Sequence, residues 1–316
     1  MTSFRHRRGW VAALVLLPVT ALMIASTAVS PANARTSRNG TAQLTTSDRT
    51  VRPNEKVTVR GRFRPIAQQA AGIDAGGDPA APAVRIQFRA LGARYWHDVR
   101  STRAAKTGRF KKRMKVSRSG RIRALSADGR ATRAHRVTVR SVTRARVEKR
   151  AKVGQKVTVR GRVAPAGTKR KVTVKVGGDK LRTRTDKRGR FKAKWKPRKA
   201  GHHRVKVRAS GNLVAKGSRA RAGKVTIFRN AEASWYGPGL YGNGVACGGT
   251  LTPSTMGVAH KTMPCGTKLT IRYHGRQVKA KVIDRGPYVP GREFDLTEAV
   301  KNKLGMGGVG IIQVDR

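Results

Sequence analysis

The hexapeptide Val57-Thr-Val-Arg-Gly-Arg62 recurs unchanged at residues 157–162, and the proline at position 65 recurs at position 165. These two copies are 100 residues apart, whereas Gly108-Arg-Phe110 recurs as Gly189-Arg-Phe191 at an offset of 81 residues. A fixed order with unequal offsets indicates a duplicated unit whose first copy holds about nineteen extra residues. We place this insertion in the Ala-, Gly- and Pro-rich residues 67–82 and predict a surface loop there.

Within the duplicated region, valines alternate with basic or polar residues. Val172, Val174 and Val176 are interleaved with lysine and threonine, and a similar alternation follows at residues 204–208. Alternation with a period of two predicts half-buried strands. Short strands separated by Gly, Pro and Asp turns over about 100 residues fit a β-sandwich. The pattern resembles bacterial immunoglobulin-like repeats, which implies two sandwiches, over residues 35–143 and 144–230.

The charge of the chain is extreme and uneven. Its 316 residues carry 71 Lys and Arg against 15 Asp and Glu, a net charge of +56, which excludes an ordinary acidic cytosolic enzyme. Residues 35–230 hold 57 basic and 9 acidic residues (+48), and residues 231–316 hold 11 and 6 (+5). Side chains on one face of a strand repeat every ~6.8 Å, a spacing that suits a linear polyanion. We therefore expect the sandwiches to dock on an anionic envelope polymer that offsets their self-repulsion; a merely solvated basic surface is the alternative.

Nucleic acid is the other common polyanion. The basic repeats lack interleaved aromatic residues of the kind that stack on bases, and no helix-turn-helix or zinc-finger pattern is present. The sequence therefore predicts no specific nucleic-acid partner. Non-specific binding to DNA in vitro is expected, because neutralisation of phosphates needs no sequence readout.

The N-terminus has the organisation of a secretory signal. Three arginines precede an apolar run at residues 11–23, and Ala32-Asn-Ala34 supplies the small residues that signal peptidase recognises. We predict a signal peptide at residues 1–34, cleavage after Ala34, and a secreted, wall-associated protein with no membrane contact after cleavage. A single membrane anchor is the alternative, although the apolar run is shorter than the ~20 residues needed to span a bilayer. Export favours a disulfide between Cys247 and Cys265.

The last 86 residues differ in composition, since they hold both cysteines and four of the five tyrosines. Five segments follow in order: Ala233-Ser-Trp-Tyr-Gly237, Ala246-Cys-Gly-Gly249, residues 257–267, Val282-Ile-Asp-Arg-Gly-Pro-Tyr288 and Phe294-Asp-Leu-Thr297. In order and spacing they resemble the double-psi β-barrel domain of the rare lipoprotein A family of septal lytic transglycosylases, and more distantly the expansins. The resemblance implies a double-psi β-barrel over residues 231–316 and an all-β fold for the whole chain, with one short helix.

In that family the barrel binds a peptidoglycan glycan strand, and catalytic members cleave the strand to leave a 1,6-anhydro end. The resemblance implies a site at His260, Asp284 and Asp295. One carboxylic acid suffices for this reaction, because it protonates the glycosidic oxygen and then accepts the proton of the sugar's own 6-hydroxyl. We predict Asp295 or Asp284 as this acid and base, with His260 orienting the substrate.

Each of these residues also has a structural interpretation. Asp284 ends an alternating strand before Arg285-Gly-Pro287 and could accept backbone N–H bonds in that turn. Asp295 has the spacing of a helix N-cap, ahead of an apolar helical face that ends at Gly305. His260 could be a packed residue rather than a groove residue.

One position departs from the family pattern. Catalytic members usually carry a Glu directly after a Gly, 11 residues before the histidine, and here that position is Gly249. The missing acid favours a non-catalytic, expansin-like barrel that binds or loosens the wall. Sugar rings would then stack on aromatic side chains, for which core positions are the alternative. The candidates are Trp235, Tyr236, Tyr241 and Tyr288.

The function that we predict from the sequence is a secreted cell-wall protein whose barrel binds and cleaves peptidoglycan glycan strands, with basic repeats that dock on an anionic polymer. The alternative is a non-catalytic, expansin-like wall-binding protein. A structural or nucleic-acid-condensing basic protein would fit the charge but would leave the barrel without a role. No cofactor or metal is predicted, because the histidines and carboxylates form no recognisable ligand set. Nothing in the sequence indicates an oligomeric state.

Overall fold

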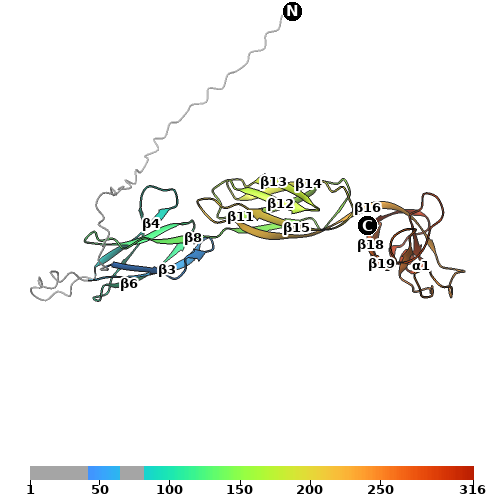
Figure 1. Cartoon of the computed structure of the whole chain (residues 1–316), viewed down its shortest axis with the longest axis horizontal. Helices are drawn as coiled ribbons and strands as arrows, with labels where there is room; N and C mark the ends of the chain where they lie inside the picture. Colours follow the sequence, from blue (N-terminus) through green and yellow to red (C-terminus); the bar gives the residue numbers. More distant parts are fainter. Residues whose placement is uncertain (1–41, 65–81) are drawn as a thin grey trace, which may run out of the picture. The chain divides into compact units, whose positions relative to one another are not determined.

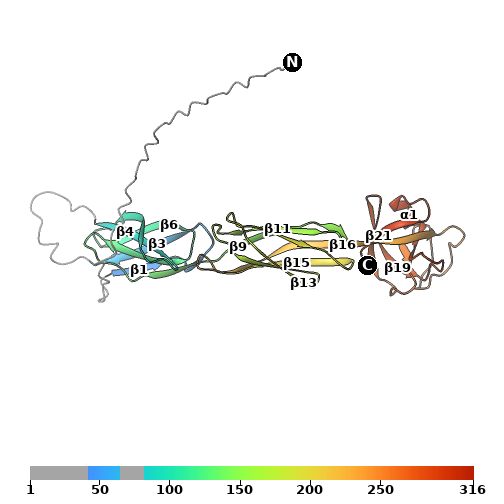
Figure 2. The same cartoon turned by 90° about the horizontal axis from the view of Figure 1, so that it is seen from above.

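The computed structural model of the chain describes residues 42–64 and 82–316 (Figures 1 and 2). The predicted signal peptide lies outside the described residues, and so does the predicted surface loop at 67–82 apart from Pro82. The described residues form an all-β protein with a single helix. No helix in this part of the chain is long and apolar enough to cross a lipid bilayer.

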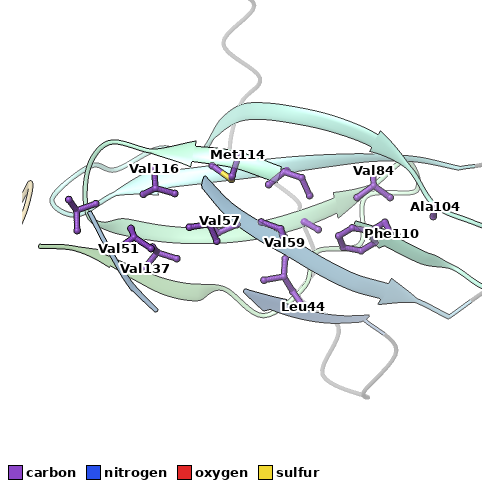
Figure 3. Packing of buried hydrophobic residues seen from close by; sticks show 14 of the residues in the cluster. Leu44, Val51, Val57, Val59, Val84, Ala104, Phe110, Met114, Val116 and Val137 are labelled. Carbon is purple, nitrogen blue, oxygen red and sulfur yellow. The ribbon is translucent and has the colours of Figure 1, made fainter. Parts of the chain in front are cut away.

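The first repeat consists of two β-sheets. One has three strands in the order β1-β3-β6, namely β1 (Ala42–Thr46), β3 (Glu55–Phe63) and β6 (Arg109–Val116). The other has five strands in the order β2-β8-β7-β4-β5, namely β2 (Thr50–Val51), β4 (Ala83–Ala90), β5 (His97–Arg103), β7 (Gly120–Ser126) and β8 (His135–Val139). Inward-facing residues such as Val57, Val59 and Phe110 form a buried apolar cluster between the strands (Figure 3). Two packed sheets of this kind are an immunoglobulin-like sandwich.

The second repeat has the same topology. Its three-stranded sheet has the order β14-β11-β9, with β9 (Val142–Val147), β11 (Val157–Ala164) and β14 (Arg190–Trp195). Its other sheet joins β10 (Arg150–Lys152), β16 (Ser218–Tyr236), β15 (Gly201–Ala209), β12 (Lys171–Val176) and β13 (Asp179–Arg184). The parallel pair β10–β16 is the counterpart of the parallel pair β2–β8. The duplicated sequence therefore encodes a duplicated strand order.

The duplicated glycine and phenylalanine motifs pack against each other. Gly61 lies directly opposite Phe110 in the sheet, and Gly161 lies directly opposite Phe191. A Cβ atom on either glycine would lie within 2.2–2.4 Å of the opposite phenylalanine ring. Only glycine leaves room for the ring, which explains why both motifs are present in both repeats.

Six strands close the C-terminal barrel. Strand β16 continues from the second repeat and pairs with β20 (Phe294–Thr297) and β21 (Gly310–Val314). The remaining strands are β17 (Gly257–Ala259), β18 (Lys268–Tyr273) and β19 (Arg276–Asp284). The order β16-β20-β17-β19-β18-β21 returns to β16, so the sheet has no free edge. The boundary expected at residue 230 from composition falls inside β16, because one continuous strand serves both sheets.

The helix α1 (Glu298–Leu304) covers the barrel with Val300 and Leu304 and ends at Gly305, as its apolar spacing predicts. Its N-cap is Thr297, so the interpretation of Asp295 as the cap was wrong. Asp295 lies two residues earlier, inside β20, where backbone pairing with two neighbouring strands keeps the chain extended.

Candidate functional site

Sheet register brings the two predicted aspartates into one row. Asp284 at the end of β19 is paired with Ala259, Ala259 is paired with Asp295, and Asp295 is paired with Ser234. The four residues thus lie side by side across four strands. Neighbouring strands are ~4.8 Å apart, which places the backbones of the two aspartates about 10 Å from each other.

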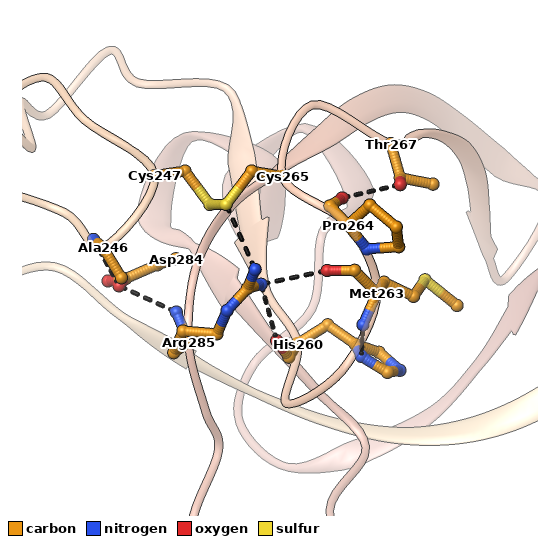
Figure 4. Close-up of a disulfide and its surroundings, with 9 residues drawn as sticks. All are labelled: Ala246, Cys247, His260, Met263, Pro264, Cys265, Thr267, Asp284 and Arg285. Atoms are coloured by element: carbon orange, nitrogen blue, oxygen red, sulfur yellow. Dashed lines mark hydrogen bonds between the residues drawn. A yellow bond between two sulfur atoms is a disulfide. The ribbon is translucent and has the colours of Figure 1, made fainter.

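Asp284 is held by backbone donors. Its Oδ1 atom accepts hydrogen bonds from the backbone N–H groups of Arg285 at 2.8 Å and Ala246 at 2.9 Å (Figure 4). The predicted turn interaction is therefore present. The second bond ties a distant loop to the end of β19 and helps to balance the charge of the carboxylate.

Asp295 is half-buried and poorly satisfied. The Ser234 hydroxyl faces it, and the Tyr236 hydroxyl faces Asp284. Asp295 Oδ1, Ser234 Oγ and Tyr236 Oη are nevertheless buried without a hydrogen bond of normal geometry in the described part of the chain. The two carboxylates and the two hydroxyl groups thus form one cluster of polar side chains at the ends of β19, β20 and β16.

Burial raises the pKa of Asp295, and the nearby Asp284 carboxylate adds to this rise, whereas the Ser234 hydroxyl and Arg292 oppose it. Burial also raises the pKa of the Tyr236 phenol, and the two carboxylates add to this effect. A carboxyl group with a raised pKa beside a second carboxylate stabilised by N–H donors is an arrangement suited to acid and base chemistry.

His260 lies in a packed position. Its Nδ1 accepts hydrogen bonds from the backbone N–H groups of Thr262 at 3.1 Å and Met263 at 3.0 Å, and its ring packs on Phe294. The Nε2 atom is 3.5 Å from Glu293 Oε1. Burial lowers the pKa of His260. Because Nδ1 accepts two bonds, the neutral ring carries its proton on Nε2, which points to Glu293.

Cys247 and Cys265 form the predicted disulfide, with Cα atoms 5.5 Å apart (Figure 4). The Arg285 guanidinium donates to the carbonyl oxygens of His260 and Met263 and to the Cys265 sulfur. The disulfide and this arginine therefore connect the segment bearing His260 to the strand that ends at Asp284.

Comparison with known proteins agrees with this geometry. A family model described as "Lytic transglycolase" matches residues 229–316. Over 91 residues the chain is 44% identical to the probable endolytic peptidoglycan transglycosylase RlpA of Aquifex aeolicus, a match that covers 28% of this chain and 40% of that protein. Over 84 residues it is 39% identical to the endolytic peptidoglycan transglycosylase RlpA of Campylobacter jejuni, covering 26% and 30%. Residues 229–316 are a double-psi β-barrel of the rare lipoprotein A type.

The family model covers residues 229–316, and the curated relatives match 26–33% of this chain. The chain spans 24–40% of the length of these relatives. Among solved structures, the Streptomyces papain inhibitor is similar over 28% of this chain and 93% of its own, at 24% identity and a TM-score of 0.22. The fibronectin(III)-like modules of Clostridium thermocellum CbhA are similar over 59% of this chain and 95% of their own, at 12% identity and a TM-score of 0.23.

The four aromatic residues predicted to bind sugars have different surroundings in the double-psi barrel. Trp235 is half-buried, packs against the core and carries Lys301 Nζ over its ring at 3.7 Å. Tyr236 is half-buried beside the two aspartates. Tyr241 donates a hydrogen bond to Glu298, and this bond raises the pKa of the phenol. Tyr288 is 79% exposed and leaves its ring open to solvent.

Sequence reasoning missed Glu293. Its carboxylate is paired with two nitrogens of the Arg229 guanidinium, and the hydrogen bonds from Arg229 lower the pKa of Glu293. The same carboxylate approaches His260 from the residue next to β20. Nothing in the spacing of these positions links them, since 64 residues separate Glu293 from Arg229. The only available signal was an acidic residue immediately before the Phe-Asp-Leu-Thr segment.

Gly249, which replaces the expected glutamate, lies in a loop of the double-psi barrel and has a φ of 92°, a conformation that side chains with a Cβ rarely adopt. In the described residues, no three His, Cys, Asp or Glu side chains converge in a way that could hold a metal ion.

Proposed function

We propose that the protein acts on the bacterial cell wall, and that its double-psi barrel binds peptidoglycan glycan strands and cleaves them as a lytic transglycosylase. The row of Asp284 and Asp295 carries this proposal, because it combines a half-buried carboxyl of raised pKa with a second carboxylate held by two N–H donors. The names of the matched relatives point to the same chemistry.

In the proposed reaction the protonated Asp295 donates its proton to the glycosidic oxygen, and the bond from that oxygen to C1 of the muramic acid breaks. The Asp284 carboxylate stabilises the positive charge that develops on the sugar ring. The 6-hydroxyl oxygen then attacks C1 and gives its proton to Asp295, which restores the acid and leaves a 1,6-anhydro end. His260 positions the Phe294–Asp295 segment through Glu293 and the packing of its ring on Phe294.

The test is incubation of the full chain, with its disulfide intact, with isolated sacculi, followed by mass spectrometry of the released muropeptides. Wild-type protein should release anhydro-muropeptides, and Asp295→Asn should reduce the rate by about 10²–10⁴-fold, as expected for loss of a general acid. Glu148→Gln, an exposed acid of the second repeat, should leave the rate unchanged. Retention on sacculi without anhydro products at high loading would refute the enzyme and support the non-catalytic, expansin-like alternative.

We further propose that the basic repeats dock the protein on an anionic polymer of the envelope. Their net charge of +48 supports this, because bound counter-charge relieves the repulsion among so many cations. Retention of the full chain on walls should fall as salt is raised, and it should fall more steeply on walls that keep their anionic polymers than on stripped walls. Salt-insensitive retention would contradict the docking role.

A further inference from the structure

Six exposed cationic side chains form two rows on the outward face of sheet β14-β11-β9 in the second repeat. The register pairs Arg160 with Arg146 on one side and Lys192 on the other. It likewise pairs Arg162 with Arg144 and Arg190. All six residues are exposed. Each row therefore holds three cations across three strands.

The spacing of these rows matches a chain of phosphodiesters. Directly opposed residues have Cβ atoms ~5 Å apart, so three side chains of one row can converge on a single anionic group. The two rows are ~6.8 Å apart along the strands. Successive phosphorus atoms in an extended phosphodiester chain are separated by six single bonds, which is about the same distance as that between the rows.

Nothing in the described part of the chain neutralises these cations, since none of the six forms an ion pair there. Like charges directly opposite each other destabilise a sheet. An open hollow of about 780 Å³ lies among the six cations, and its lining also includes Ala145, Gly161 and Phe191. The nearby acid Asp186 accepts a hydrogen bond from the backbone N–H of Arg190. The face is thus hollow and strongly basic: among the described residues, Asp186 is the one acid that lines the hollow, and it forms no ion pair with any of the six cations.

Two features favour phosphate over other anions and over nucleic acid. Five of the six side chains are arginine, whose planar fork binds phosphate oxygens in pairs. The only aromatic ring at the hollow belongs to Phe191, which is buried (5% exposed) and therefore offers no platform on which a base could stack.

We propose that this face of the second repeat is the binding site for the anionic polymer and that the polymer is a base-free, wall-linked phosphodiester chain. This inference rests on the docking role proposed above and deepens it. Each row holds one phosphate, and successive phosphates occupy successive rows. The corresponding face of the first repeat is weaker, because Thr45 and Gln43 stand where Arg146 and Arg144 stand in the second repeat.

The experiment compares two triple variants of the full chain. Arg146→Gln/Arg160→Gln/Lys192→Gln removes one row. The matched control, Lys175→Gln/Lys180→Gln/Lys206→Gln, removes an exposed cross-strand row of three lysines from the opposite sheet. Binding of a soluble poly(glycerol phosphate) oligomer is measured over a series of NaCl concentrations. Both variants lose the same charge, and the circular dichroism and melting temperature of each report its folding.

We expect the first variant to bind at least tenfold more weakly at low salt, and its slope of log K against log salt to be shallower by about 2, the value for three lost contacts to a flexible strand. The control should change the slope by less than 1. Equal losses in both variants would overturn the assigned face while leaving electrostatic docking intact, whereas no binding by the wild type would refute docking itself. Tighter binding of oligodeoxythymidylate than of poly(glycerol phosphate) would overturn the choice of a base-free polymer.

A third variant, Arg146→Lys/Arg160→Lys, preserves the charge and tests the paired hydrogen bonds. It should keep the salt slope of the wild type and lose affinity several-fold, because lysine cannot bind two phosphate oxygens in a planar fork. Unchanged affinity would overturn the inference that the arginines bind phosphate oxygens in pairs.

Discussion

At the scale of single residues, Arg170 and Asp295 are among the ionisable side chains that the fold buries without full compensation. Arg170 is 2% exposed, and its three guanidinium nitrogens have no hydrogen-bond partner within the described residues. Burial lowers the pKa of this guanidinium. Asp295 is half-buried with one unpaired oxygen. Arg170 takes no part in the proposed reaction, whereas Asp295 is its proposed acid and base.

We expect Arg170→Met to stabilise the second repeat. A buried charged group without partners costs at least about 1–3 kcal/mol, and methionine fills a similar volume without a charge. Denaturant unfolding should show an increase in the free energy of unfolding of this order. Lys171→Met, at the exposed neighbouring position, should change it by less than about 0.5 kcal/mol. Destabilisation by Arg170→Met alone would mean that the guanidinium binds a partner in solution.

The raised pKa of Asp295 predicts a pH-dependent stability. A carboxyl group whose folded-state pKa lies above its unfolded value of ~3.9 favours folding at low pH, and this contribution is lost as the pH rises through the folded-state pKa. Asp295→Asn should therefore match the wild type near pH 3 and become progressively more stable than it toward pH 7. Thermal melts across this range test the prediction, and a pH-independent difference would contradict it.

At the scale of elements, the two repeats depend on a glycine and a phenylalanine that lie opposite each other in adjacent strands. The motif Val-Thr-Val-Arg-Gly-Arg supplies alternating valines for the core and arginines for the outer face. The glycine interrupts this alternation because the ring of the neighbouring strand occupies the volume of a side chain. A duplicated sequence motif thus corresponds to a duplicated packing contact.

Gly161→Ala should destabilise the second repeat by about 1–3 kcal/mol, the usual cost of overpacking. Its Cβ would lie 2.4 Å from both the Phe191 ring and the Arg144 carbonyl oxygen. Adding Phe191→Leu should not restore stability, because the carbonyl clash remains. The control Gly307→Ala meets no atom within 4 Å and should be neutral or slightly stabilising. Denaturant midpoints distinguish these outcomes, and a neutral Gly161→Ala would contradict the packing argument.

The disulfide is the second stabilising feature at this scale, because it links the loop before β17 to the segment after β17. Its cysteines are 18 residues apart. Closing such a loop stabilises a fold by about 3 kcal/mol in the chain-entropy model. Cys247→Ser/Cys265→Ser should lower the barrel's free energy of unfolding by that amount, and reductant should lower the wild type equally while leaving the variant unaffected. Further loss in the variant on reduction would show that the effect has another source.

At the scale of the whole molecule, charge and chemistry are divided between the parts of the chain. The repeats hold a net charge of +48, whereas the barrel segment holds +5 together with both aspartates of the proposed site. Self-repulsion therefore acts mainly within the repeats. It should weaken as salt shortens the screening length from ~10 Å at 0.1 M toward ~3 Å at 1 M.

Salt should accordingly stabilise the repeats more than the barrel. Raising NaCl from about 0.02 to about 0.5 M shortens the screening length to roughly the distance between neighbouring strands. This change should slow amide hydrogen exchange in β3 and β11 and should alter exchange less in β19. Exchange followed by mass spectrometry resolves these strands separately. A uniform change across all three strands would indicate that general salt effects, and not self-repulsion, govern stability.

Much of the architecture was determined by the sequence itself. Duplicated motifs and alternating valines predicted two sandwiches, because strand periodicity and turn residues are local properties of the chain. The barrel was expected from the resemblance of five ordered segments to a known family. The disulfide and the end of the helix at Gly305 were also predicted and are present. The alternation along each strand predicted exposed cations, but the two rows of three cations depend on which strands become neighbours in the sheet.

Only the tertiary structure decided how the candidate site is assembled. Asp295 proved to be a strand residue and not a helix cap, because pairing with β16 and β17 outweighs its capping propensity. His260 is engaged by Glu293, which is in turn held by Arg229, and these partners come from distant parts of the chain. Local sequence determined which strands form, whereas burial and charge at each site residue depend on neighbours that only barrel closure brings together.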